Sequence, residues 1–241
     1  MPSDVTFPGP PPYERLLPDL LAAGRPYSLV LGGSWALYAH GLTGRTGPGV
    51  ELVTESPVPM ADIAAALRAG LAARGWQAEA AAVDPLSLRL LVAEPGGAEG
   101  ERLTADLRKE TLWRPPSDSP YGPVLAAEDA VGLRVRALAD LGLPRDLVDV
   151  RAASARWSPV ELEELARRHA PETFDLTDLQ ARLAGTEWLD DWEFARCGLD
   201  AEETAALRRW AQGWADDIAE RVMEEAPYED APEPGAGPDE R

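Results

Sequence analysis

The chain has 241 residues, 45% of them hydrophobic, and its 42 Asp and Glu residues outnumber its 23 Lys and Arg residues, which gives a formal net charge of −19. This length and apolar content suffice for one large domain or two smaller ones with a packed core, which excludes a largely disordered protein. A chain this negative repels phosphate backbones, so we expect no broad non-specific binding of nucleic acid.

The cysteine content and the hydropathy pattern bear on the cellular compartment. Cys197 is the single cysteine, and the chain has two histidines. One cysteine excludes an intramolecular disulfide, and this set cannot form a four-cysteine or Cys-His zinc cluster. No stretch approaches the roughly twenty apolar residues that cross a membrane, and the first residues do not look like a secretion signal. We therefore expect a cytoplasmic protein that neither spans a membrane nor is exported.

Both ends of the chain have compositions that disfavour regular structure. The proline-rich run 8–12 cannot form regular helix or sheet hydrogen bonds, so we expect residues 1–12 to be extended, as part of an N-terminal arm over residues 1–24. Residues 226–241 combine Pro, Gly and acidic side chains with almost no apolar ones, so burial cannot offset the chain entropy. We expect these last residues to form a disordered acidic tail.

Between residues 25 and 124, short apolar runs alternate with helical patterns. Ile63, Leu67 and Leu71 are spaced for one face of an amphipathic helix. The Gly-rich polar segment 94–100 is typical of a hairpin turn. These patterns predict strands over 27–31, 50–54, 86–92 and 102–107, and helices over 35–40 and 60–74. This part is expected to be a mixed α/β domain.

After Pro123 the strand signals end and helical patterns follow. The predicted helices cover residues 126–141, 145–155, 159–169, 175–184 and 200–223. Ser158 precedes Pro159 and Glu161, and Asp200 precedes Glu203, which are N-terminal capping patterns. Trp210 and Trp214 are four residues apart, so we expect them to pack in the core. The sequence thus predicts an α+β fold, with a mixed-sheet domain over 25–124 followed by an all-helical domain over 125–225.

A glycine-rich turn follows the first predicted strand. Gly32-Gly33-Ser34 lies between that strand and a helix, where exposed backbone N–H groups bind phosphate oxygens well. The same pattern is typical of a tight turn with close packing, so both interpretations stay open.

Two acidic residues are expected near this turn. Glu51 lies on the predicted strand 50–54, and Asp106 lies on the predicted strand 102–107. Carboxylates that converge on a phosphate-binding loop are typical of a divalent-metal site for phosphoryl or nucleotidyl transfer, although a single acidic residue at a strand end is usually just solvated.

The order of these features resembles a known family. Gly33-Ser34, a helix ending in His40-Gly41, Arg45, the acidic position 49–51 and the later Asp106 resemble the nucleotidyltransferase fold, and more narrowly the abortive-infection toxins of the AbiEii/AbiGii type. The resemblance covers about residues 25–155. It continues through the segments 127–140 and 144–149, which are similar to that family's helix with a basic residue and its Arg-Asp-x-x-Asp segment.

The resemblance implies roles for individual residues. Gly33, Ser34 and Arg45 would bind the nucleotide, and Glu51 and Asp106 would bind Mg²⁺ and act in catalysis. Arg134 would be a further catalytic residue, at a position where the family usually has Lys. The family's Asp-x-Asp motif is degenerate here, because the sequence reads Gly49-Val50-Glu51 and the first metal ligand is missing.

Two neighbouring features have structural interpretations. Arg145 and Asp149 are spaced as an i,i+4 pair, which favours an ion pair that joins the helical half to the sheet. His40 precedes a glycine at a helix end, which favours a capping or packing role over catalysis.

Three functions follow as hypotheses. The first is a toxin-type enzyme that transfers a nucleotide from an NTP to an RNA or protein acceptor with Mg²⁺, with weak or lost activity and an antitoxin protein as its partner. The second is a catalytically degenerate protein that binds a nucleotide or a protein partner. The third is a small-molecule nucleotidyltransferase, for example one acting on an aminoglycoside, since an acidic surface suits a cationic acceptor.

Overall fold

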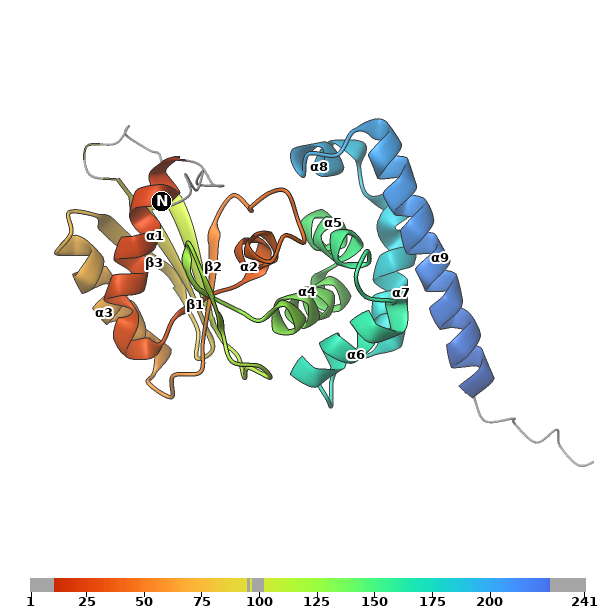
Figure 1. The fold of residues 1–241 in the computed structure, drawn as a ribbon, viewed down its shortest axis with the longest axis horizontal. Helices are drawn as coiled ribbons and strands as arrows, with labels where there is room; N and C mark the ends of the chain where they lie inside the picture. The colour runs from red at the N-terminus through yellow and green to blue at the C-terminus, as the bar shows by residue number, and fades with distance from the viewer. Residues whose placement is uncertain (1–10, 95, 97–101, 226–241) are drawn as a thin grey trace, which may run out of the picture.

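The computed structural model describes residues 11–94, 96 and 102–225. Within these residues, a mixed sheet with helices on both faces is followed by a group of helices (Figure 1). The first part contains helices α1 (Pro11–Ala23), α2 (Gly33–Ala39) and α3 (Met60–Ala72) and the short 3₁₀ helix η1 (Arg25–Tyr27). Its strands are β1 (Val30–Leu31), β2 (Val50–Thr54), β3 (Gln77–Val83), β4 (Ser87–Ala93), β5 (Leu103–Lys109), β6 (Ser117–Ser119) and β7 (Gly122–Val124).

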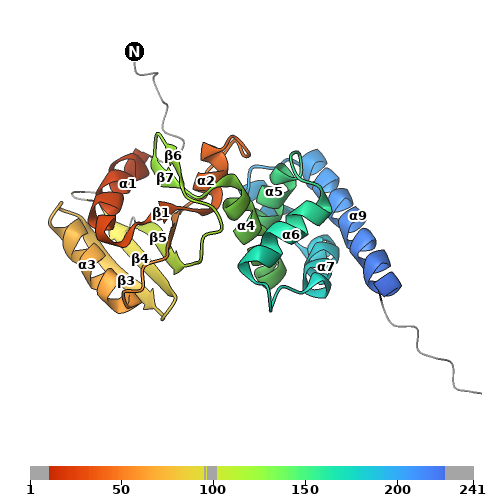
Figure 2. The same ribbon diagram turned by 60° about the horizontal axis from the view of Figure 1, so that its bottom comes forward.

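The seven strands form one sheet in the order β3-β4-β5-β2-β1-β7-β6. Strands β2 and β5 are parallel, as are β1 and β7, and the other neighbours are antiparallel. Helices α1 and α3 cover one face of the sheet, and α2 and α4 lie on the other (Figures 1 and 2). The site described below lies between this second face and α4.

Strand alternation assigns side chains to these two faces. Leu88, Leu90 and Val92 of β4 and Ala105 and Leu107 of β5 are buried. The residues between them on β4 and β5 therefore face the α4 side, which places their polar side chains at the boundary between the sheet and the helices.

The N-terminal arm was a wrong prediction for residues 11–23, which form α1. Tyr13, Leu16, Leu17 and Leu20 are buried at helical spacing and belong to the core. The first turn of a helix needs no intrahelical N–H partner, so prolines at 11 and 12 are compatible with a helix start. The remaining residues of the predicted extended segment, 1–10, lie outside the described residues.

The strand and helix predictions before residue 110 hold, most of them with shifted ends, except in two places. The strand expected over 27–31 is shortened to Val30–Leu31, because η1 and Ser28, with a left-handed φ of 51°, form a turn. Strand β3 was not predicted; it is an edge strand with mostly exposed residues and no apolar run. Of the hairpin turn expected over 94–100, the structure describes residues 94 and 96 alone.

Helices follow β7, as expected, and residues 125–225 contain no strand. The helices are α4 (Ala127–Leu141), α5 (Pro144–Ala153), α6 (Pro159–His169), α7 (Leu176–Ala184), α8 (Asp191–Arg196) and α9 (Ala201–Glu225), with the 3₁₀ helix η2 (Gly185–Trp188). The Ser158 capping box and the reciprocal bonds of Asp200 with Glu203 confirm the expected caps. Short α8 was not predicted, and the acidic tail 226–241 lies outside the described residues.

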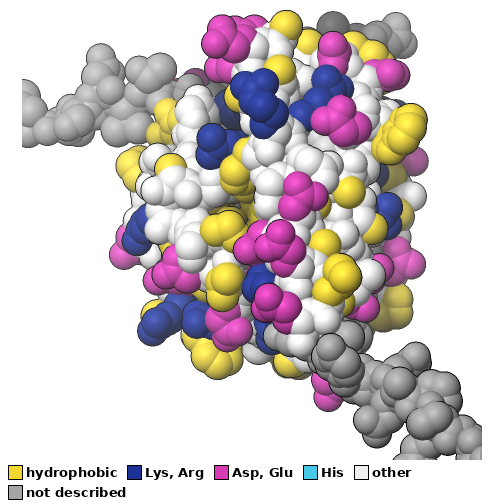
Figure 3. Space-filling view, turned by 90° about the vertical axis from the view of Figure 1, so that its right-hand side faces the viewer, with side chains coloured by type: hydrophobic (Ala, Val, Ile, Leu, Met, Phe, Trp, Pro, Cys, Tyr) yellow, Lys and Arg dark blue, Asp and Glu magenta, His cyan; other side chains and the backbone are white. Residues whose placement is uncertain are grey.

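Charged and hydrophobic side chains are interspersed over the outer face of the helical part (Figure 3). Trp214 is buried beside Trp210, with ring centroids 5.5 Å apart, so the core role expected for this pair is confirmed. Glu163 is buried under α9, where it accepts hydrogen bonds from Trp214 and Arg221.

Among the described residues, no helix has the length and apolar character to cross a membrane.

Candidate functional site

Glu51 and Asp106 lie side by side on the sheet. They are register partners on the parallel strands β2 and β5, and Arg89 of β4 is the register partner of Asp106 on its other side. Partners in neighbouring strands project to the same face. The sheet therefore presents an arginine and two carboxylates in one row beneath α4.

The glycine turn at the start of α2 contacts this row. Gly33 has a left-handed φ of +54°, and a β-carbon there would lie 2.4 Å from Cδ of Glu51. The Gly32 N–H donates to the backbone oxygen of Glu51 at 2.8 Å. Close packing thus explains the glycine at 33, which is the packing interpretation that the sequence left open.

Arg134 of α4 is the centre of a buried ion cluster. Its guanidinium lies 3.1 Å from Glu51, 2.7 Å from Asp146 and 3.3 Å from Asp149. The side chain of Arg134 is 5% exposed, and those of Asp146 and Asp149 are 1% and 2% exposed. One side chain therefore joins the sheet, α4 and α5.

The ion cluster shifts the pKa values of its carboxyl groups in opposite directions. Burial raises the pKa of Glu51, but Arg134, Arg145 and Arg108 outweigh it, so that the pKa lies below the ordinary value of 4.5. For Asp146 and Asp149, burial outweighs the attraction of Arg134 and their pKa values are raised. Burial lowers the pKa of Arg134, but the three carboxylates outweigh it and hold Arg134 in its charged form.

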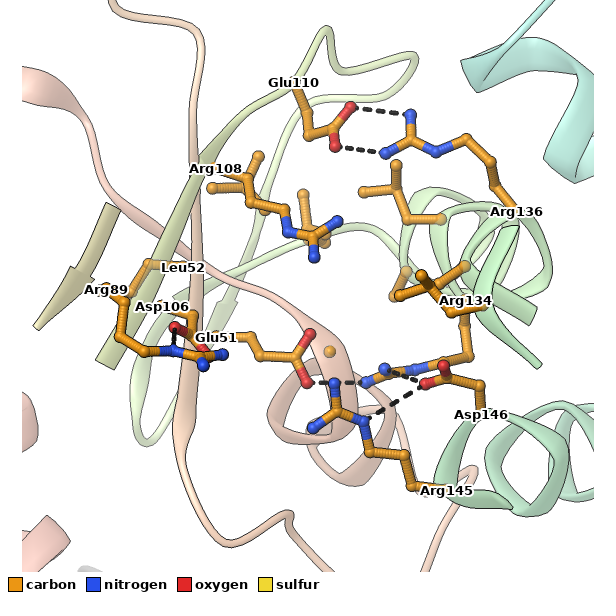
Figure 4. A pocket seen from close by; sticks show the side chains of 17 residues that line it. Glu51, Leu52, Arg89, Asp106, Arg108, Glu110, Arg134, Arg136, Arg145 and Asp146 are labelled. Atoms are coloured by element: carbon orange, nitrogen blue, oxygen red, sulfur yellow. Dashed lines mark hydrogen bonds and ion pairs between the residues drawn. The ribbon is translucent and has the colours of Figure 1, made fainter. Parts of the chain in front are cut away.

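Two arginines that the sequence analysis missed complete the sheet side of the site. Arg89 donates to both oxygens of Asp106, at 2.7 and 3.0 Å. Arg108 extends from β5 toward the space between Glu51 and the ion pair of Glu110 with Arg136 (Figure 4). The sequence signal for both is the alternation of side chains along a strand. Each arginine follows a buried leucine, and Arg108 is two residues after Asp106, so it lies on the same face.

Ser34 and Arg45 have structural partners. Ser34 is buried, and its hydroxyl accepts a hydrogen bond from the Gly47 N–H at 2.6 Å. Arg45 pairs with Asp149 at 2.9 Å, so Arg45 rather than Arg145 is the partner of Asp149. Arg145 instead lies 3.7 Å from Asp146. The expected ion pair between the helical half and the sheet half exists, with a different arginine.

His40 has the packing role that we expected. Its Nε2 lies 2.7 Å from the backbone oxygen of Leu125, which links the end of α2 to the segment before α4. Among the described residues, no hydrogen bond or ion pair joins it to the ion cluster.

Two adjoining hollows surround the ion cluster, each of about 700 Å³ including space open to solvent. They share Glu51, Arg89, Asp106, Arg134 and Arg145. We call the two together the arginine pocket. The first hollow also contains Arg108 and has an apolar wall formed by Val53, Leu125, Leu133, Ala137 and Leu141. The second contains Ser34, Arg45 and Gly49. The six residues expected at the site thus line one composite pocket.

The residues of the pocket do not fit the expected Mg²⁺. In the part of the chain that the structure describes, no group of three or more His, Cys, Asp or Glu side chains could hold a metal ion. The carboxylates of Glu51 and Asp106 are bound by arginines, and position 49 has no side chain. Mg²⁺ in proteins takes carboxylates with near-octahedral geometry, and two-metal sites need a bridging acid.

The sequence matches no protein-family model and no curated protein. Solved structures are similar in fold. JHP933 from Helicobacter pylori has a TM-score of 0.52 and 17% identity, over 88% of this chain and 94% of its own. A second H. pylori structure, of a proposed nucleotidyltransferase, has a TM-score of 0.53 and 15% identity, over 88% of this chain and 96% of its own.

A third structure is less similar. MenT4, a nucleotidyltransferase toxin from Mycobacterium tuberculosis, has a TM-score of 0.43 and 14% identity, over 85% of this chain and 91% of its own. The two H. pylori structures confirm the predicted fold class: this chain is a mixed α/β protein similar to nucleotidyltransferase folds.

Proposed function

We propose that this protein binds a nucleotide in the arginine pocket and transfers it slowly or not at all. One observation carries the proposal: within a nucleotidyltransferase-like fold, one hollow is lined both by arginines and by the apolar wall. A nucleotide combines the same two characters, since it has charged phosphates and an apolar base face. Ligand pockets are commonly apolar with a few converging polar groups.

The same geometry supports weak or lost transfer. Two-metal nucleotidyl transfer needs carboxylates that hold two ions about 4 Å apart. Gly49 supplies no carboxylate, and Arg89 and Arg134 bind the two carboxylates that remain. The site would thus lack the metal ions whose positive charge stabilises the transition state. Such stabilisation contributes several kcal/mol in comparable sites.

Calorimetric titration of the full chain with each of the four NTPs tests the binding half. We expect saturable binding, which Ala137→Phe weakens because the new ring fills the apolar wall. Ala181→Phe, on an exposed position of α7, is the matched control and should bind like the natural protein. The absence of NTP binding by the folded protein, with and without Mg²⁺, would refute this proposal.

A labelled-NTP assay with total RNA, protein and aminoglycoside acceptors tests the transfer half. We expect little or no labelled product. Brisk Mg²⁺-dependent transfer that Asp106→Ala abolishes would show that Glu51 and Asp106 suffice for catalysis. The labelled class would then identify the acceptor.

The narrower assignments rest on the sequence resemblance. An abortive-infection toxin role with an antitoxin partner, the RNA or protein acceptor and the aminoglycoside alternative stay predictions. The same holds for the phosphate contacts assigned to Gly33, Ser34 and Arg45. A toxin role would be supported by growth arrest on expression and its relief by a co-expressed neighbouring gene product.

A further inference from the structure

We propose that the arginine pocket binds the nucleotide phosphates without a divalent metal ion, and that Arg108 is the cation that receives them. Arg89 and Arg134 would lie where a metal would otherwise contact the two carboxylates. This inference rests on the nucleotide binding proposed above and names the counter-ion of that same site.

Both carboxylates that could bind a metal already bind guanidinium groups. Arg89 donates to the two oxygens of Asp106 in a bidentate arrangement. Arg134 donates to Oε1 of Glu51 at 3.1 Å. Charge-assisted and bidentate pairs are the stronger class of hydrogen bond, so a metal ion would have to displace them before it could bind.

Arg134 is held in place by more than Glu51. Its other contacts are Asp146 and Asp149, which are almost fully buried. Moving the arginine away would leave these two carboxylates as uncompensated buried charges, which is strongly unfavourable. The guanidinium beside Glu51 is therefore a fixed part of the pocket.

The charge balance of the pocket also favours a metal-free ligand. Five arginines (45, 89, 108, 134 and 145) face four carboxylates (51, 106, 146 and 149), while Arg136 and Glu110 neutralise each other. The pocket thus has an excess of one positive charge before any ligand binds. A phosphate group brings negative charge to this excess, whereas Mg²⁺ would add to the positive side.

Arg108 is the arginine that is free to take the ligand. Within the described chain, its side chain has no hydrogen bond or ion pair, and its guanidinium points into the first hollow (Figure 4). Arg145 is 45% exposed, and its contact with Asp146 is as long as 3.7 Å. Guanidinium groups match phosphate oxygens with a planar fork of donors, so these two arginines can bind phosphate without breaking a strong contact.

Titration of the full chain with ATP and with inorganic triphosphate, each in EDTA and in excess Mg²⁺, tests the inference. We expect both probes to bind in EDTA at least as tightly as in Mg²⁺. Arg108→Gln should weaken binding in EDTA by about tenfold, which corresponds to one lost charge-assisted contact. Its melting temperature should change little, because the side chain has no hydrogen bond or ion pair within the described chain.

Arg102→Gln is the matched control, since Arg102 lies directly before β5 but pairs with Glu79 outside the pocket. It should bind both probes as the natural protein does. Binding that occurs in Mg²⁺ and disappears in EDTA would overturn the metal-free inference and leave nucleotide binding intact. Equal binding by Arg108→Gln and the natural protein would overturn the role of Arg108. Binding in neither condition would refute both proposals.

Discussion

A β-carbon on Gly33 would lie 2.4 Å from Cδ of Glu51, so the glycine turn and the acidic strand position fit together with no space between them. The same Glu51 is bound by Arg134 at 3.1 Å. The carboxylate is therefore enclosed by the start of α2 on one side and by α4 on the other. The glycine is required here by backbone conformation and by packing.

The first prediction concerns this contact. Gly33→Ala should lower the free energy of unfolding by about 2 kcal/mol or more, because a left-handed backbone disfavours a β-carbon and Glu51 must move. Urea denaturation measures the loss. Gly213→Ala is the control: no atom lies within 4 Å of its new carbon, so the helix preference of alanine should leave stability equal or higher. A Gly33→Ala variant with an unchanged free energy of unfolding would mean that the start of α2 does not hold Glu51 in place.

The second prediction concerns the buried arginine. Arg134→Met should lower the free energy of unfolding by about 3–5 kcal/mol, because Asp146 and Asp149 remain buried without their counter-ion. Adding Asp146→Asn and Asp149→Asn should recover part of the loss, since these changes remove the unpaired charges. Arg102→Met breaks an exposed pair and should cost no more than about 1 kcal/mol. Equal losses in the two arginine variants would contradict the central role of Arg134.

The third prediction is a pH dependence. The pKa of Glu51 is lowered in the folded protein, so its ionised form contributes stability above its ordinary pKa of 4.5. The stability difference between the natural protein and Glu51→Gln should be full at pH 7 and should shrink as the pH falls through the lowered pKa. Thermal denaturation from pH 7 to well below the ordinary pKa of 4.5 measures this difference.

The contributions of Asp146 and Asp149 to stability depend on pH in the opposite direction. Burial raises their pKa values, so their contribution is present at low pH and is lost as the pH rises through the raised values. Asp146→Asn should therefore show a stability difference that changes with pH in the opposite direction to that of Glu51→Gln. The same pH trend in both variants would contradict the assignment.

The fourth prediction restores an acidic pair. Gly49→Asp with Glu51→Asp should gain Mg²⁺-dependent stabilisation by NTP, measured as a rise in melting temperature over the EDTA control. Gly49 has no left-handed backbone, so the new side chain is not strained, although its β-carbon would lie 3.0 Å from the Thr104 hydroxyl. A folded double variant with no Mg²⁺-dependent gain would show that an acidic pair at positions 49 and 51 is not enough to bind Mg²⁺ beside Arg89 and Arg134.

The fifth prediction tests the place of α1 in the core. The Tyr13 hydroxyl donates to the Pro48 oxygen at 2.8 Å and accepts from the Thr104 N–H at 3.1 Å. Tyr13→Phe should cost about 1–3 kcal/mol, because both backbone groups lose their partner. Tyr27→Phe is the control, since its hydroxyl has no hydrogen bond within the described chain. Equal stability of both variants would contradict the anchoring of α1.

The amino-acid sequence by itself determined the elements with strong local patterns. Strand β2, residues 50–54, was predicted at its observed bounds, because an apolar run between turn residues defines a buried strand. The start of α6 was equally clear, because Ser158, Pro159 and Glu161 act within one turn. The degenerate acidic motif at Gly49 and Glu51 rests on the sequence resemblance and stays a prediction.

The tertiary structure decided which charges meet. Arg134 and Glu51 are 83 residues apart, and nothing in either local sequence specifies that Asp146 and Asp149 share the same guanidinium. Helix α1 likewise depends on tertiary contacts: Pro18 inside it disfavours a helix locally, but burial of Tyr13 and Leu17 in the core outweighs this effect. Local patterns record the preferences of neighbouring residues. Ion-pair partners and buried faces depend on distances between distant segments, which are set when the whole chain packs.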